Sequence, residues 1–100
     1  MSAPLAATDL RGRVVRNDPY RTGVPAEGVR AVLLDQNQRP AGNAVSGADG
    51  FYYLYNVRPG IYQVEFRFVN LRTRQEARKR IGVTVENRQS QDIPLVTLEN

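Results

Sequence analysis

The sequence predicts an all-β domain in which two sheets pack face to face as a sandwich. Apolar and polar residues alternate over short stretches, turn residues separate these stretches at intervals of about 8 to 12 residues, and no stretch has the period of an amphipathic helix. A chain of 100 residues, 41% of them hydrophobic, suffices for one core. We therefore expect an N-terminal tail over residues 1–8 and a single β-sandwich domain over residues 9–100.

A long loop separates the first two expected strands, and a short turn precedes the third. Leu10–Arg16 and Gly28–Asp35 carry alternating apolar residues, and residues 17–26 between them contain Pro, Gly and Asp, which favour loops. Residues 36–41 form the next turn. Asn43–Gly47 then follows as a short third strand.

Two turn signals delimit the next two strands. Asp49-Gly50 is typical of a β-hairpin turn because glycine tolerates a positive φ, and Phe51–Val57 follows it as the fourth strand. Pro59-Gly60 suits the central positions of a type II turn. This turn leads into Ile61–Val69, the longest expected strand.

The last two strands follow a polar loop over residues 70–77. Arg80–Glu86 and Ile93–Leu98 are the strands expected there, which brings the number of expected strands to seven. Pro94 cannot donate a hydrogen bond to a neighbouring strand. The last strand is therefore expected at a sheet edge or with a bulge.

The composition excludes most enzyme chemistry. The chain has no Cys and no His, so it lacks thiol nucleophiles, the usual general base and the commonest metal ligands. The acidic residues Asp35, Asp49 and Glu65 fit a strand end, a turn and an outer strand face. No apolar run approaches the roughly 18 residues of a membrane span. We predict that the protein is not an enzyme and uses no cofactor.

Turn glycines and apolar residues stand at characteristic spacings in four segments. These segments are Gly12-x-Val14, Gly28-Val29-x-Ala31-x-Leu33-x-Asp35, Asp49-Gly50-x-Tyr52-x-Leu54-x-Asn56-Val57 and Pro59-Gly60-x-Tyr62-x-Val64. Over residues 9–98 the chain thereby resembles the carboxypeptidase-regulatory-like domains and the related collagen-adhesin B-type and Sdr-type B repeats of bacterial surface proteins. The resemblance implies a seven-stranded transthyretin-like (prealbumin-like, Ig-like) β-sandwich of Greek-key type, with Tyr52, Leu54 and Val57 facing the core.

The chain departs from this family at functional positions. B-type repeats with an internal Lys–Asn isopeptide bond carry a lysine in the first strand, and this strand has none here. Their assisting acid falls two residues after the position of Val64, where this chain has Phe66. No such crosslink is therefore expected. The loop after the first strand offers only Asp18 as an acidic ligand, so we predict no calcium or other metal site.

Phe51, Tyr53 and Tyr55 are expected on the outer face of the fourth strand, and we call them the aromatic row. Side chains two residues apart on a strand share a face and lie about 6.6 Å apart. Three aligned aromatic rings are typical of an interaction surface, either a protein interface or a carbohydrate platform. A loop or the N-terminal tail covering the row, or ordinary cross-strand packing, would also account for it.

Val32 and Leu34 make the second strand apolar on both faces. They alternate with Val29, Ala31 and Leu33, which are expected to face the core. A strand that is apolar on both faces is usually covered on both. We therefore add Val32 and Leu34 to the expected interaction surface, although single exposed apolar residues are also common.

The net charge of +4 comes from one segment. Residues 67–80 hold six basic residues and one acidic residue, whereas the rest of the chain holds eight basic and nine acidic residues. A solvated hairpin tip or an acidic partner would each explain this segment. Nucleic acid is not expected, because residues 69–80 contain no aromatic residue interleaved with the basic ones. The arginines expected to assist docking are Arg67, Arg72, Arg74, Arg78 and Arg80.

These observations predict a non-catalytic structural or interaction module. The absence of a signal-peptide pattern in residues 1–8 favours a small subunit or surface decoration of a large assembly such as a virion capsid. The family resemblance favours a secreted or cell-surface protein instead. The expected partner is another protein or a second copy of the chain, and a carbohydrate-binding module, as in starch-binding relatives of similar fold, is the alternative.

Overall fold

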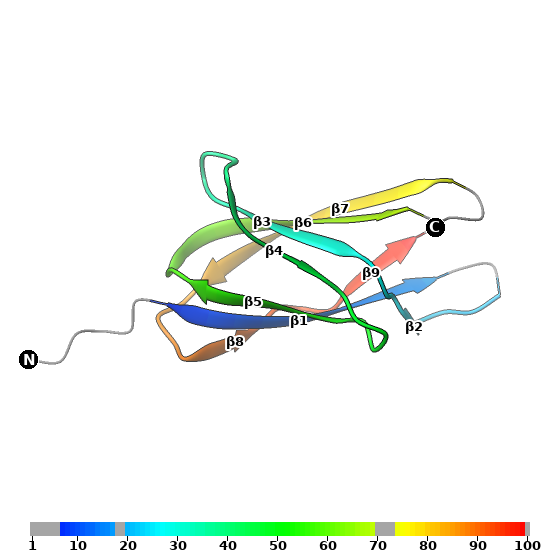
Figure 1. Ribbon diagram of the computed structural model, residues 1–100, viewed down its shortest axis with the longest axis horizontal. Helices are drawn as coiled ribbons and strands as arrows, with labels where there is room; N and C mark the ends of the chain where they lie inside the picture. The colour runs from blue at the N-terminus through cyan, green and yellow to red at the C-terminus, as the bar shows by residue number, and fades with distance from the viewer. Residues whose placement is uncertain (1–6, 18–19, 70–73, 100) are drawn as a thin grey trace, which may run out of the picture.

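All regular structure in the computed structural model, which describes residues 7–17, 20–69 and 74–99, is β-strand (Figure 1). The expected all-β class is thus confirmed. The strands in these ranges are β1 (Thr8–Asn17), β2 (Val24–Pro25), β3 (Arg30–Leu34), β4 (Pro40–Val45), β5 (Phe51–Val57), β6 (Gly60–Val69), β7 (Glu76–Val85), β8 (Ser90–Asp92) and β9 (Val96–Glu99).

The strands form two sheets, as the sandwich prediction requires. In the five-stranded sheet β1 is central: it pairs antiparallel with β5 and β2 on one side and parallel with β8 and β9 on the other. The four-stranded sheet has the order β4-β3-β6-β7, with all neighbours antiparallel. β4 contacts β5 and β7 contacts β9, so the two sheets lie face to face (Figure 1).

The core lies between the sheets and is built from every second residue of the long strands. Tyr52 and Phe66 are its largest fully buried side chains, and their rings meet edge to face with centroids 5.5 Å apart. Leu54 and Val57 are buried beside Tyr52, as the family resemblance implied. Burying an apolar side chain of this size stabilises the fold by about 1.5–3 kcal/mol. The outer face of each sheet, which points away from the core, is left to contact solvent or a partner.

The C-terminal region differs from the prediction of one strand over 93–98. Two short strands, β8 and β9, flank Pro94, and within the described ranges both pair only with β1. Pro94 therefore lies in a break of an edge strand, where no ladder hydrogen bond is lost. Two further expectations change: β2 lies inside the expected loop 17–26, and β7 begins at Glu76 rather than at Arg80.

The turn at Asp49-Gly50 was expected to close a hairpin, and this expectation is wrong. The turn is present, since Gly50 has a φ of 81° and donates its N–H to the carbonyl of Gly47 at 2.9 Å. It joins β4 and β5, however, which belong to different sheets. A Cβ on residue 50 would lie 2.5 Å from the carbonyl oxygen of Val14, so glycine is required for this close crossing.

The connection from β5 to β6 also crosses between the sheets. Gly60 has a φ of 159°, which is not the value of about 80° that a type II turn requires at its third residue, so this prediction is wrong too. Asn56 takes the left-handed conformation instead, with a φ of 57°. The Tyr62 hydroxyl donates to the carbonyl of Arg58 at 2.7 Å, in the manner of the tyrosine corner of β-sandwiches, and stabilises the crossing.

Candidate interaction surfaces

The aromatic row lies on the outer face of the five-stranded sheet, along the edge strand β5. Tyr53 and Tyr55 are 44% and 66% exposed, and their rings stack in parallel, with centroids 6.3 Å apart and planes inclined by 9°. Within the described residues β5 pairs only with β1, so the row stands beside a free sheet edge. The two tyrosines thus present a rigid, apolar and solvent-accessible surface with hydroxyl groups at its rim.

Phe51 differs from the two tyrosines because arginine side chains cover it in part. The guanidinium carbons of Arg11 and Arg13 lie 5.7 and 5.5 Å from the centre of its ring, within the range of cation–π contacts. Arg11 pairs in turn with Asp92 at 3.2 Å. Leu95, exposed between β8 and β9, borders a shallow hollow next to Phe51. The aromatic row therefore continues into a cationic, partly apolar depression.

Val32 and Leu34 do not join the aromatic row. Both belong to β3, in the four-stranded sheet, and their side chains face away from the core on the other side of the sandwich. Leu34 is buried and Val32 is half-buried, so neither offers a large apolar contact area. A partner that rests on Tyr53 and Tyr55 cannot contact them at the same time.

Four of the five expected arginines fall within the described residues. Arg67, Arg78 and Arg80 are on the outer face of β6 and β7. Arg74 precedes β7, is exposed and has a positive φ of 58°, and Arg72 falls outside the described residues. The expectation that Arg67, Arg78 and Arg80 assist docking at the aromatic row is wrong, because they lie on the opposite face of the sandwich.

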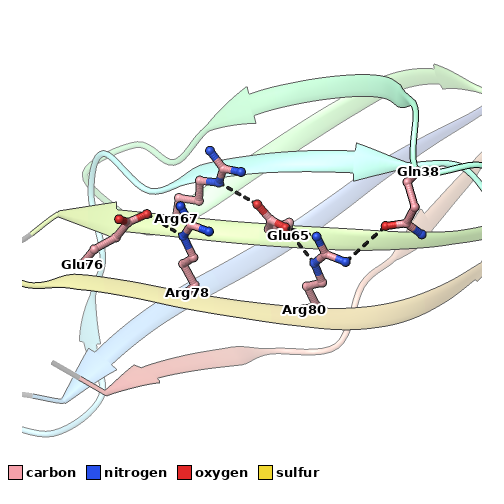
Figure 2. A network of polar contacts seen from close by, with 6 residues as sticks. All are labelled: Gln38, Glu65, Arg67, Glu76, Arg78 and Arg80. Atoms are coloured by element: carbon pink, nitrogen blue, oxygen red, sulfur yellow. Dashed lines mark hydrogen bonds and ion pairs between the residues drawn. The ribbon is translucent and has the colours of Figure 1, made fainter.

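Glu65 organises the arginine side of the molecule (Figure 2). It was expected to point outward, and it does lie on the outer face of β6, yet its side chain is only 7% exposed. Its Oε1 accepts from Arg67 Nε at 2.6 Å, and its Oε2 accepts from Arg80 Nε at 2.7 Å. These two hydrogen bonds hold the pKa of Glu65 below its usual range.

Two further contacts extend this network along the strands (Figure 2). Arg80 Nη1 donates to Gln38 Oε1 at 3.1 Å, which connects β7 to the turn between β3 and β4. Arg78 Nε donates to Glu76 Oε1 at 2.7 Å within β7. The carboxylates of Glu65 and Glu76 thus fix three of the arginines in place.

Arg30 was not among the expected site residues, yet it belongs to the same face. Its Cα is the register partner of Arg67, and Arg67 is in turn the partner of Arg78 on β7. Arg30 lies far from residues 67–80 in sequence, so a search for charge runs does not find it. Arg30 and Val32 are two residues apart on the expected second strand, which indicates that they share a face. Only the strand order places Arg30 beside Arg67.

The described ranges contain no group of three or more acidic residues close enough together to hold a metal ion. In the same ranges no helix is long and apolar enough to cross a membrane.

In comparisons with known proteins, this chain is similar to solved structures only. No protein-family model and no curated protein matches the chain. Among solved structures, the minor pilin GBS52 of Streptococcus agalactiae superposes with a TM-score of 0.70 at 14% identity, over 96% of this chain and 45% of the pilin. The major pilin subunit BcpA of Bacillus cereus gives a TM-score of 0.65 at 17% identity, over 94% of this chain and 30% of BcpA.

A third similar structure has about the size of this chain. It is a putative carbohydrate binding protein, PA1324, from Pseudomonas aeruginosa, with a TM-score of 0.64 at 11% identity, over 95% of this chain and 90% of that protein. This chain thus spans less than half the length of the two pilins and nearly all of the Pseudomonas protein. At these identities the comparisons show a shared β-sandwich fold.

Proposed function

We propose that this protein is a non-catalytic structural module of a surface or secreted assembly that docks onto another protein through Tyr53 and Tyr55. Its resemblance in fold to domains of two pilin subunits supports this setting, whereas none of the three structures named above supports a virion. With this function we propose a tail over residues 1–8 and one domain over residues 9–100. A domain of this length is within the usual size range of a single folding unit.

The observation that carries the proposal is the parallel stack of Tyr53 and Tyr55. Exposed tyrosines are enriched at protein interfaces because they offer a large contact area at a low cost in conformational entropy. The stack fixes both rings before binding, so less entropy is lost when a partner covers them. Arg11 and Arg13, at the side of the stack, can supply hydrogen bonds at the rim of such an interface.

The first test is the solution mass, measured by light scattering over a range of concentrations. We expect a second copy of the chain to occupy the surface, so the wild type should form a concentration-dependent oligomer. The double variant Tyr53→Ala/Tyr55→Ala should remain a monomer. Ile61→Ala is a matched control, since Ile61 is equally exposed but belongs to β6 in the other sheet.

Monomers for both the wild type and the double variant would exclude self-association and leave a different protein or a glycan as the partner. An oligomer that persists in the double variant would show that another surface makes the contact. Either result would refute docking between copies through the tyrosine stack.

Carbohydrate binding is the second candidate function. The tyrosine stack and the hollow beside Phe51 together offer ring faces and charged hydrogen-bonding groups, which are the two kinds of contact that a sugar needs. The similarity in fold and size to PA1324 also favours this function.

A glycan array distinguishes this second function from a protein interface. Sugar binding should be lost in Tyr53→Ala without any change in solution mass. Docking between copies of the chain predicts the reverse, namely a change of mass and no glycan signal. Ile61→Ala again serves as the control variant in both assays.

A further inference from the structure

We propose that the outer face of the four-stranded sheet is a second docking surface, which binds an acidic, carboxylate-rich segment of a partner protein. Its centre is a row of three arginines, Arg30 on β3, Arg67 on β6 and Arg78 on β7, which we call the arginine row. This surface lies on the opposite side of the sandwich from the tyrosine stack. The proposal therefore does not depend on what Tyr53 and Tyr55 bind.

The strand register places the three arginines side by side. Arg30 is the Cα partner of Arg67, and Arg67 is the Cα partner of Arg78, so all three project from the same face on adjacent strands. Neighbouring strands are about 4.8 Å apart. Like charges directly opposite one another across strands are destabilising. A carboxylate that binds across the row would reduce this repulsion.

The internal carboxylates neutralise the arginine row only in part. Glu65 is shared between Arg67 and Arg80, and Glu76 pairs with Arg78. No hydrogen bond or ion pair joins the side chain of Arg30 to another residue of the described ranges. The face thus carries four arginines against two acids, and Arg30 is available to a ligand.

The network also holds the arginines in place before binding. Glu65 is buried and contacts Arg67 and Arg80 with its two oxygens, while Gln38 holds the other end of the Arg80 guanidinium (Figure 2). Side chains that are already fixed lose less entropy on binding. Guanidinium groups in fixed positions are suited to bidentate contacts with carboxylates.

The surroundings of the arginine row favour a protein as the source of the carboxylates. Val32 adjoins the row, and the side chains of Val45 and Val69 at its borders are 58% and 50% exposed. Within the described ranges this face carries no aromatic residue on which a base or a sugar ring could stack. Acidic residues three or four apart on a helix are about 5–6 Å apart, close to the strand spacing.

Poly-L-glutamate is the probe for a direct test, with binding measured by fluorescence anisotropy at low and at physiological salt. Arg30→Gln/Arg67→Gln should bind about tenfold more weakly than the wild type, since exposed ion pairs contribute up to about 1 kcal/mol each. Arg58→Gln/Arg88→Gln removes the same charge from the connections after β5 and β7, and should bind as the wild type does. Arg30→Gln alone breaks no internal contact and should still weaken binding by about two- to fivefold.

Three results would overturn the proposal. The first is equal weakening in the Arg58→Gln/Arg88→Gln control, which would show that only the net charge matters. The second is no weakening in Arg30→Gln. The third is that heparin or single-stranded DNA binds more tightly than poly-L-glutamate, and that Arg30→Gln/Arg67→Gln weakens this binding to the same extent. That result would assign the surface to a different class of polyanion. Tyr53→Ala/Tyr55→Ala should bind poly-L-glutamate like the wild type. The proposal for the arginine row can therefore be refuted without refuting the proposal for the tyrosine stack, and the reverse also holds.

Discussion

The ring of Tyr52 lies directly over the backbone of Gly12. The two residues are Cα partners in the pairing of β1 with β5, and Tyr52 is almost completely buried. A Cβ on residue 12 would overlap the end of the phenol ring. Glycine is therefore needed at position 12 for space, because an aromatic side chain from the neighbouring strand fills the volume that any other side chain would occupy.

Gly12→Ala should lower the free energy of unfolding by about 1–3 kcal/mol, because Tyr52 has no room to move in a packed core. Urea denaturation measures this loss. Gly82→Ala is the matched control: Gly82 lies in β7, has no positive φ, and has open space where the Cβ would be. The control should change the stability by less than about 0.5 kcal/mol. Equal effects of both substitutions would refute the packing argument.

Tyr52→Phe should not destabilise the protein at neutral pH and should raise its stability by up to about 1–3 kcal/mol. The Tyr52 hydroxyl is buried, and no hydrogen-bond partner is found for it among the described residues. A buried polar group without a partner costs about this much, and phenylalanine removes the group while keeping the ring that covers Gly12. The melting temperature is the measurement, and a clear decrease would show that the hydroxyl has a partner such as a buried water.

The same tyrosine should make the wild type sensitive to alkali. Burial raises the pKa of Tyr52 above its usual value of 10.0. Above that pH the unfolded chain releases the proton and the folded chain retains it, so stability falls as pH rises, by about 1.4 kcal/mol per pH unit. This decrease should be absent in Tyr52→Phe and present in Tyr55→Phe, which removes an exposed phenol. Urea midpoints between pH 9 and about 11.5 test this difference.

Glu65→Gln should destabilise the protein at neutral pH by about 1–3 kcal/mol, because it weakens hydrogen bonds between a buried carboxylate and two guanidinium groups. The pKa of Glu65 is lowered in the folded state. Its contribution is therefore fully present above the unfolded-state pKa, about 4.3, and is lost as pH falls through the folded-state value. The wild type and the variant should thus converge in stability in acid.

Glu27→Gln is the control for this experiment, since Glu27 is exposed in the segment before β3. It should match the wild type from neutral to acidic pH. A stability difference between Glu65→Gln and the wild type that stays constant down to pH 2.5 would show that the charge of Glu65 is not what stabilises the fold.

The sequence predicted which face of a strand each side chain occupies better than it predicted which strands lie next to each other. Alternation placed Leu54 and Tyr53 on opposite faces, because side chains on a strand alternate with a period of two, and the family resemblance indicated that Leu54 faces the core. It also placed Glu65 on the outer face. It did not predict that Glu65 is buried there, because the burial depends on Arg80, fifteen residues further along the chain, and on the strand pairing that brings it close.

The connections between strands were the other source of error. Asp49-Gly50 has the local chemistry of a tight turn, and that chemistry is indeed used. Turn chemistry does not say whether the next strand pairs with the previous one or crosses to the other sheet. That choice depends on the pairing partner of β5, which is β1 in the other sheet. For the same reason Arg30 was missed, as its neighbours Arg67 and Arg78 become adjacent only through the order β3-β6-β7.

Ser46 is a final example of a residue whose role depends on tertiary structure. Its buried hydroxyl accepts from the Val29 N–H at 2.9 Å and donates to the carbonyl of Ala26, so it connects the end of β4 to the segment that leads into β3. Ser46→Ala leaves both backbone groups buried without this partner.

We therefore expect Ser46→Ala to lower the free energy of unfolding by about 1–3 kcal/mol, which corresponds to a decrease of at least about 4 °C in the melting temperature of a domain of this size. Ser90→Ala removes an exposed hydroxyl from β8 and should change the melting temperature little. Because Ser46 holds the residue next to Arg30, Ser46→Ala should also weaken poly-L-glutamate binding, while Ser90→Ala should not. A destabilised variant with unchanged binding would show that Arg30 is positioned by the sheet pairing of β3 alone.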